Sequence, residues 1–291
     1  MNQNGNNGGA VITNGHQAKE DQNILSISNV TISFDGFTVL DDLGFFIGRG
    51  EMRFLIGPNG AGKTTLLDVI TGKSKPDRGT VTFDGDVNLS RRSEHAVVKL
   101  GISRKFQAPS VFNSLTVVQN LETSVRFRNR VIGMFRSLPE EQSQIVQQTL
   151  ELIGLEERAH RNAGVLSHGE RQWLEIGMLL VQKPKLLLLD EPVAGMTRRE
   201  RDRTGELLQE IARERSVLVV EHDMEFVRQF AKTVTVLHQG KVLSEGTMDM
   251  VQQDPQVVHA YLGRSREASG NEGPSAHRTS VNGSAAVEIQ G

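Results

Sequence analysis

The chain has 291 residues, no cysteine and a formal net charge of -2, a length that suits one large domain or two modest ones. Disulfides, zinc–thiolate sites and thiol nucleophiles are excluded, and the charge gives no indication of nucleic-acid binding, which usually needs a basic excess. The sequence lacks a secretory signal and any apolar run near the roughly 18–20 residues of a membrane span, so we expect a soluble intracellular protein.

The first part of the chain predicts a polar tail followed by antiparallel strands. Residues 1–22 are rich in Asn, Gly and Gln, and residues 264–291 are rich in Ser, Gly, Ala and Asn, so both ends are predicted to be disordered. Ile24–Phe34 largely alternates apolar and polar residues, the pattern of a half-buried strand. Val39–Phe46 and Thr80–Phe83 are predicted to continue as short strands.

The next segment, Gly57–Thr64, fits the phosphate-binding pattern G-x-x-x-x-G-K-[ST]. The apolar Met52–Ile56 before it predicts a buried strand, and Thr65–Ile70 after it predicts a helix. Glycines let backbone N–H groups turn toward phosphate oxygens, and the helix N-terminus adds partial positive charge. Lys63 can reach the β- and γ-phosphates, and the Thr64 hydroxyl can ligate Mg²⁺. The predicted nucleotide-binding residues are Gly57, Pro58, Asn59, Gly60, Ala61, Gly62, Lys63, Thr64 and Thr65.

The second half of the chain predicts helices and then a parallel sheet. Glu140–Ile153 is the clearest helical stretch. Lys185–Asp190 and Ser216–Glu221 are continuous apolar strands of the parallel kind, joined by a charged helical crossover at about Arg198–Arg213. A hairpin is predicted at about Thr233–Leu243. The sequence has no internal repeat, so we expect one nucleotide cassette.

Polar side chains follow two of these strands, where open α/β sheets bind ligands. Asp190 can hold Mg²⁺ directly or through a water, and Glu191 can accept a proton from an attacking water. His222, at the end of the next strand, can hydrogen-bond a γ-phosphate oxygen. Gln107, after Ser103–Phe106, can touch Mg²⁺ or the water. Each assignment has an alternative. Asp190 and Glu191 could simply open a turn, His222 could be a solvated loop histidine, and Gln107 could have no functional role.

The segment Leu166–Glu170 predicts a Ser/Gly turn that opens a helix, a second phosphate-binding geometry. Taken alone, this segment is a helix cap. Since the domain already has a P-loop, a second phosphate-binding helix start needs another nucleotide. The simplest source is a partner subunit.

These motifs, in this order and spacing, resemble the ATP-binding subunit of ABC transporters over Ile24–Gly263. The resemblance implies an α/β P-loop NTPase fold at 23–263, with a RecA-like core, an antiparallel β-subdomain and a helical subdomain at about 100–165. It implies that two cassettes meet head to tail, so that Ser167 and Gly169 act on the partner's ATP. It also implies that an aromatic residue stacks on adenine. Phe34 aligns best and Phe37 second, with a core role as the alternative.

Finer features narrow the resemblance. Asp190–Met196 and Val220–Met224 are similar to the branched-chain amino-acid and urea importers, and Leu166–Leu180 is similar to an ATPase subunit of urea importers. Glu170 stands where most of the family has Gln, and Thr197 stands where most of it has Asp.

The predicted function is therefore an ATPase that uses ATP and Mg²⁺ to power an importer, for urea or short-chain amides. The implied partners are a second, paralogous ATPase subunit, integral membrane permease subunits and, indirectly, a substrate-binding protein, with no nucleic acid. The implied location is the cytoplasmic face of the membrane. Large apolar residues in Pro109–Leu138 are predicted to contact the permease; internal packing is the alternative. The alternative functions are a branched-chain amino-acid importer ATPase, a non-transport ABC ATPase, and a P-loop kinase or GTPase.

Overall fold

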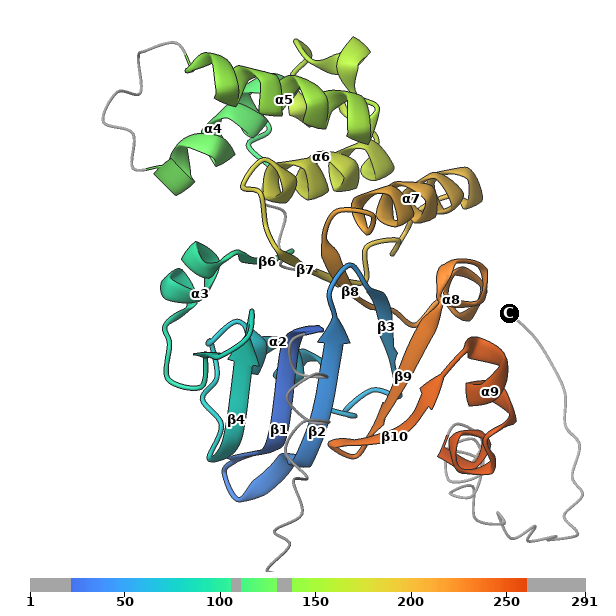
Figure 1. Cartoon of the computed structure of the whole chain (residues 1–291). Helices are drawn as coiled ribbons and strands as arrows, with labels where there is room; N and C mark the ends of the chain where they lie inside the picture. The colour runs from blue at the N-terminus through green and yellow to red at the C-terminus, as the bar shows by residue number, and fades with distance from the viewer. Residues whose placement is uncertain (1–21, 106–110, 130–137, 261–291) are drawn as a thin grey trace, which may run out of the picture.

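Two β-sheets frame the molecule (Figure 1), which a computed structural model describes over residues 22–105, 111–129 and 138–260. One sheet is antiparallel, in the order β2-β1-β4-β5, and the other has the order β10-β9-β3-β8-β7-β6. The first contains β1 (Asn23–Phe34), β2 (Phe37–Gly48), β4 (Arg78–Phe83) and β5 (Val87–Asn88). The second contains β3 (Met52–Ile56), β6 (Ile102–Arg104), β7 (Leu186–Asp190), β8 (Ser216–Val220), β9 (Thr233–His238) and β10 (Lys241–Gly246).

The six-stranded sheet is buried on both faces, so its central strands are buried without alternation and, apart from Arg53 and the strand ends Ser216 and Asp190, apolar. Neighbouring pairs from β6 to β9 run parallel, and β10 pairs with β9 in the antiparallel sense. The carboxyl ends of β3, β7 and β8 therefore meet at one edge. This edge is where the P-loop, Asp190 and His222 emerge.

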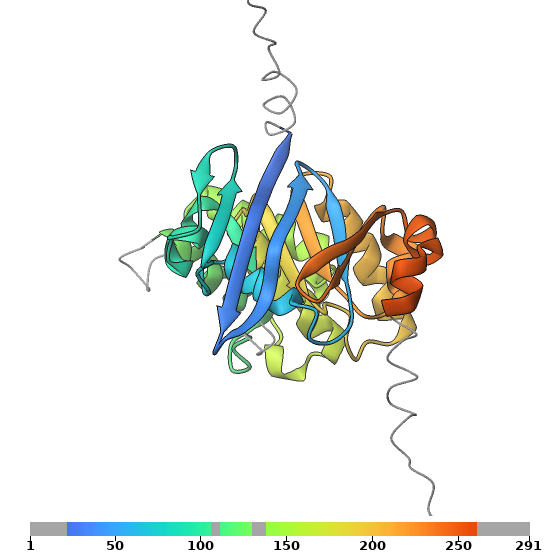
Figure 2. The same ribbon diagram turned by 90° about the horizontal axis from the view of Figure 1, so that it is seen from below.

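Different helices cover the two faces of this sheet (Figures 1 and 2). Leu186 and Leu188 belong to the core shared with α2 (Lys63–Ile70) and the antiparallel sheet. Leu187 and Leu189 point the other way, into the core shared with the helices of the opposite face. Those helices are α6 (His168–Leu180), α7 (Arg198–Ile211) and α8 (Met224–Phe230).

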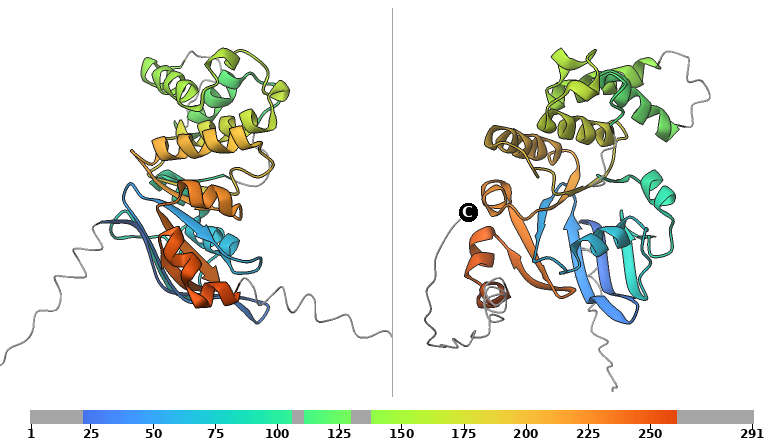
Figure 3. Two further views of the ribbon diagram at one scale, coloured as in Figure 1. Left: turned by 90° about the vertical axis from the view of Figure 1, so that its right-hand side faces the viewer. Right: turned by 180° about the vertical axis from the view of Figure 1, so that it is seen from behind.

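A helical layer lies beyond α6 (Figure 3) and contains α4 (Val117–Asn129) and α5 (Glu140–Ile153). Two short turns, η1 (Glu156–Arg158) and η2 (Ala163–Val165), lead from α5 to α6. Val111 is buried in the core of this layer, which fits the internal-packing alternative, whereas Phe112 is 46% exposed. The other predicted contact residues, Phe127, Met134 and Phe135, lie outside the described side chains.

The predicted α/β class, with an antiparallel subdomain and a helical subdomain, is confirmed. One small element differs from the helical subdomain predicted at about 100–165: β6, which follows α3 (Glu94–Leu100), belongs to the parallel sheet. The last named helix is α9 (Met248–Gln253). Of the predicted tails at 1–22 and 264–291, all residues but Gln22 lie outside the described residues. Within the described ranges, no helix is long and apolar enough to cross a bilayer.

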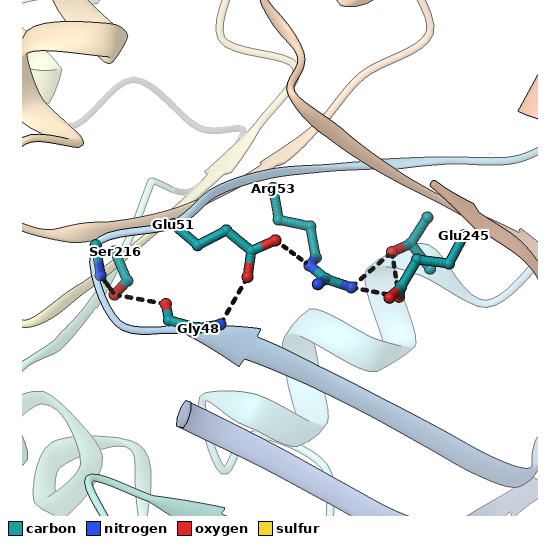
Figure 4. Close-up of polar contacts among 7 residues, drawn as sticks. Gly48, Glu51, Arg53, Ser216 and Glu245 are labelled. Carbon is teal, nitrogen blue, oxygen red and sulfur yellow. Dashed lines mark hydrogen bonds and ion pairs between the residues drawn. The ribbon is translucent and has the colours of Figure 1, made fainter. Parts of the chain in front are cut away.

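A buried arginine joins the two sheets at the end opposite the P-loop (Figure 4). Arg53 on β3 is 3% exposed and donates to Glu51 Oε1 over 2.8 Å, to Thr235 Oγ1 over 3.1 Å and to Glu245. Its guanidinium also lies 4.6 Å from the ring centroid of Phe46 on β2. Because a buried charge is costly unless it is paired, this network makes the position of β3 depend on both sheets.

Replacing Arg53 with Met is expected to lower the free energy of unfolding by about 3 kcal/mol, because the two carboxylates lose their shared cation. Urea denaturation measures this change. The control is Lys241→Met, which breaks an exposed ion pair with Asp41 and is expected to leave the midpoint unchanged. Equal midpoints for Arg53→Met and the parent would show that the buried network contributes nothing to stability.

Candidate functional site

The P-loop connects β3 to α2 through a backbone that only glycine fits at two positions. A Cβ on Gly57 would overlap the Leu237 carbonyl oxygen. Gly62, which precedes α2, has φ of 103°, and a Cβ there would press on Leu40 and the Val39 carbonyl. The neighbouring strands thus hold the loop tightly against the sheet edge, with the N-terminus of α2 facing the concave side of the loop.

Lys63 is the first residue of α2, and its ammonium group lies over the loop. Its Nζ donates to the carbonyls of Gly57 over 2.6 Å and Pro58 over 3.1 Å. Partial burial lowers the pKa of Lys63, and the charges of Glu191 and Asp190 oppose this shift. The structure therefore brings the predicted lysine and both predicted carboxylates into one electrostatic site.

Asp190 ends β7 as a buried carboxylate with a cation beside it. Arg104 from β6 donates to Asp190 Oδ2 over 3.3 Å and also pairs with Asp68 of α2. Burial raises the pKa of Asp190, and Arg104 opposes that shift. The sequence reasoning did not assign Arg104 a role. It fixes the orientation of Asp190 and links three elements around the P-loop.

Glu191 follows Asp190 and points toward His222. Its Oε1 lies 3.2 Å from His222 Nδ1, and the two side chains are 40% and 64% exposed. The backbone of Glu191 has φ of 50°, a left-handed conformation that costs a non-glycine residue roughly 1–3 kcal/mol. Glu191 N donates to the Val220 carbonyl over 2.9 Å, which anchors this turn to β8.

Glu221 is a second carboxylate at this edge that sequence reasoning placed only at a strand end. It is 1% exposed and accepts from the backbone N–H groups of Val193, His222 and Asp223 over 3.2, 3.1 and 3.4 Å. Burial raises the pKa of Glu221, and these N–H groups oppose that shift. Its carboxylate therefore joins the loop after Glu191 to the loop that carries His222.

The segment Leu166–Glu170, called the signature from here on, opens α6 with a complete capping box. Ser167 Oγ accepts from Glu170 N over 3.1 Å, and Glu170 Oε2 accepts from Ser167 N over 2.9 Å. The Glu170 carboxylate also pairs with Arg158 over 3.2 Å. The charge that distinguishes Glu170 from the family's Gln is therefore engaged by its own helix start and by an arginine.

The P-loop and the signature emerge from opposite faces of the six-stranded sheet. Helix α2 packs in the core that contains Leu55 and Leu188, whereas α6 packs in the core that contains Phe54 and Leu189 (Figure 1). Ser167 is exposed, and its side-chain contacts are to Glu170 and Glu200. The fold therefore presents Ser167 to solvent on its own side of the sheet.

The remaining predicted site residues fall at the edges of the site. Phe34 and Phe37 face each other across the β1–β2 turn and are 46% and 78% exposed, so neither is a core residue. Thr64 is exposed beside Lys63, within reach of solvent. Gln107 lies outside the described residues, between the described ends at 105 and 111.

Comparisons with known proteins agree with this arrangement. The ABC transporter family profile matches residues 40–194, and a profile described as branched-chain amino acid ATP-binding cassette transporter matches residues 241–267. The chain is 32% identical over 250 residues to the high-affinity branched-chain amino acid transport ATP-binding protein BraF of Pseudomonas aeruginosa, covering 82% of this chain and 98% of that protein. It is 33% identical over 253 residues to LivG of Escherichia coli, which carries the same description, covering 83% and 98%.

Solved structures show the same fold. An ATP-binding cassette of an ABC transporter in its ADP conformation is 29% identical and superposes with a TM-score of 0.74, covering 83% of this chain and 99% of that one. A nucleotide-free cassette from an ABC transporter is 28% identical with a TM-score of 0.72, covering 82% and 98%.

Proposed function

The chain belongs to the ABC transporter family as an importer ATPase subunit, an enzyme whose ATP hydrolysis is coupled to transport, and we propose that it powers the uptake of branched-chain amino acids. The observation that carries the catalytic part is the Glu191–His222 pair, 3.2 Å apart at the sheet edge beside the P-loop. The pair supports the proposal because a base and a hydrogen-bond donor side by side at this edge suit the γ-phosphate of a nucleotide bound to the P-loop.

In the proposed reaction Glu191 accepts a proton from the water that attacks the γ-phosphate. His222 orients this carboxylate and can donate to a γ-phosphate oxygen. Lys63 faces the β- and γ-phosphates, and the N–H groups of the loop bind their oxygens. Glu221 keeps the two loops in register through its three backbone hydrogen bonds. Exposed Phe34, with Phe37 beside it, is proposed to stack on adenine.

The residues present fit Mg²⁺ as the metal. Thr64 and Asp190 supply the hard oxygen ligands that this ion prefers, and Gln107 is proposed as a third. Within the described ranges, no group of three or more His, Cys, Asp or Glu side chains could hold a metal, so phosphate oxygens and waters must complete the shell. Mg²⁺ would neutralise charge on the phosphates, and Arg104 would hold Asp190 in place to receive it.

The second cassette is proposed to bring its ATP to the signature of this one. Exposed Ser167 and buried Gly169 lie at the start of α6, which packs on the opposite face of the sheet from α2. This position suits a nucleotide held by a partner. The conformational change driven by ATP binding and hydrolysis would then pass to permease subunits through the helical layer. Exposed Phe112 is the described residue of Pro109–Leu138 that suits this contact.

The proposed cargo follows the relatives aligned over most of the chain, whose descriptions name branched-chain amino acids. Urea is the competing cargo. The hypothesis that urea is transported is based on the resemblance within Leu166–Leu180 alone. An ATPase subunit does not touch the cargo in this architecture, so a transport measurement must separate the two.

The test is uptake by cells whose copy of this gene carries Glu191→Gln. Uptake of radiolabelled leucine, isoleucine and valine is expected to fall to background, while urea uptake is unchanged. A control strain with Glu225→Gln, an exposed carboxylate at the start of α8, is expected to transport normally. Loss of urea uptake with normal leucine uptake would replace branched-chain amino acids by urea as the cargo.

A further inference from the structure

The carboxylate of Glu200 lies on the two groups of the signature that are proposed to bind phosphate. Its Oε1 accepts from the Ser167 hydroxyl over 3.3 Å, and the Gly169 backbone N–H also donates to this carboxylate. A Cβ on Gly169 would overlap the carboxylate, which shows how closely the two pack. An anion of the same chain therefore sits where the phosphate of a second cassette would bind.

The rest of Glu200 is held by the loop that precedes α7. Its Oε2 accepts from Thr197 N over 2.9 Å and from the Thr197 hydroxyl over 2.8 Å, which completes the capping box of α7. These bonds to Thr197, with smaller contributions from Ser167 and Gly169, lower the pKa of Glu200, so the side chain is charged at neutral pH. The two oxygens of one carboxylate thus bridge the start of α7 and the start of α6.

A Ser hydroxyl has a single proton to donate. Ser167 Oγ already accepts from Glu170 N over 3.1 Å, so the contact with Glu200 uses its O–H. A γ-phosphate that binds Ser167 must therefore take this proton from Glu200. The negative charges of the Glu200 carboxylate and of a phosphate bound to the same serine also repel each other.

We propose that Glu200 is a positioning residue that competes with the partner's γ-phosphate for Ser167 and Gly169. This inference rests on the proposed trans role of the signature. Arrival of the phosphate displaces Oε1, while Oε2 remains on Thr197. The bond of 3.0 Å between His168 Nε2 and the Ala194 carbonyl keeps the same two segments together. The competition weakens closure of two cassettes on ATP and favours reopening after hydrolysis.

The test compares Glu200→Gln with its parent in full-length chains that carry Glu191→Gln to stop turnover. Gln keeps the side-chain length and serves equally in a capping box. Its amide oxygen can accept from Thr197, while its NH₂ donates to Ser167 Oγ and frees the hydroxyl proton. The ATP concentration for half-maximal association is expected to fall about tenfold. Sedimentation velocity measures this concentration for the chain alone and for the chain mixed with the second ATPase subunit of its transporter.

Two controls separate the inference from its premise. Glu206→Gln removes the same charge from an exposed position on α7 and is expected to leave the half-maximal concentration unchanged. Ser167→Arg is expected to prevent association while the chain still binds ATP at its own P-loop, as read by calorimetry.

The outcomes are distinct. An unchanged or higher half-maximal concentration for Glu200→Gln, with association abolished by Ser167→Arg, overturns the competition and leaves the trans role intact. An equal shift for Glu206→Gln also overturns it, since net charge would then be the cause. Association of Ser167→Arg at the parent's ATP concentration, or no association of any variant, removes the trans role and with it the inference.

Discussion

Replacing Glu191 with Gln is expected to lower the ATPase turnover number at least about 100-fold, the usual scale of general-base catalysis. The amide keeps the shape of the side chain but cannot take a proton from water. Backbone strain is not altered, because Gln has the same Cβ as Glu at φ of 50°. ATP binding is expected to persist, since the phosphate contacts of the P-loop and Lys63 are untouched.

A coupled phosphate-release assay measures the turnover, and size-exclusion chromatography with ATP tests for a stabilised dimer. The control is Glu225→Gln, whose carboxylate is 63% exposed at the start of α8 and pairs with Arg198 and Arg201. This variant is expected to hydrolyse ATP at the parent rate. Parent-like turnover in Glu191→Gln would remove Glu191 from the role of base.

The central part of the site was readable from the sequence because its signals are local. A glycine pattern between an apolar strand and a helix determines where the P-loop lies. An apolar run that ends in Asp190-Glu191 places both carboxylates at the sheet edge, since carboxyl ends of parallel strands meet there. These segments depend on neighbouring residues for their structure, so their prediction needed no knowledge of the remaining fold.

Strand β6 was missed for the opposite reason. Its three residues, Ile102–Arg104, are too few for a periodic pattern, and Arg104 is a charged residue that sequence reasoning expects at the surface. It is buried because Asp68 and Asp190 pair with it from two other elements. Pairing with β7 completes the strand. Such contacts depend on tertiary structure and leave no local signal.

The starts of α6 and α7 carry a sequence signal for helix capping that predicts both boundaries. Ser167-x-x-Glu170 and Thr197-x-x-Glu200 both fit the capping-box pattern, and both boxes form. Glu170 and Thr197 depart from the residues most common in the family, and each forms part of a capping box. The contact between Glu200 and Ser167 joins two helices far apart in the chain and could not have been read from either box.

Replacing Lys63 with Ala is expected to weaken ATP binding by about 10- to 100-fold, because the change removes a charge-assisted hydrogen bond to the β- and γ-phosphates. Lys63 is well placed for this contact, since its ammonium group is held over the loop by the carbonyls of Gly57 and Pro58. The shape of the loop does not depend on Lys63, because the glycine backbone and the neighbouring strands determine it. The variant is therefore expected to fold normally.

Isothermal titration calorimetry with ATP measures the dissociation constant, and circular dichroism checks that the unfolding midpoint is retained. Lys73→Ala is the matched control: this lysine lies just beyond the same helix, is 54% exposed and pairs with Asp68 over 3.2 Å. It carries the same charge and is expected to leave ATP affinity unchanged. A larger loss with Lys73→Ala than with Lys63→Ala would indicate a general electrostatic effect of the helix. Undiminished affinity in Lys63→Ala would contradict the assignment of Gly57–Thr64 as the nucleotide-binding loop, because no other cation of that loop faces the phosphates.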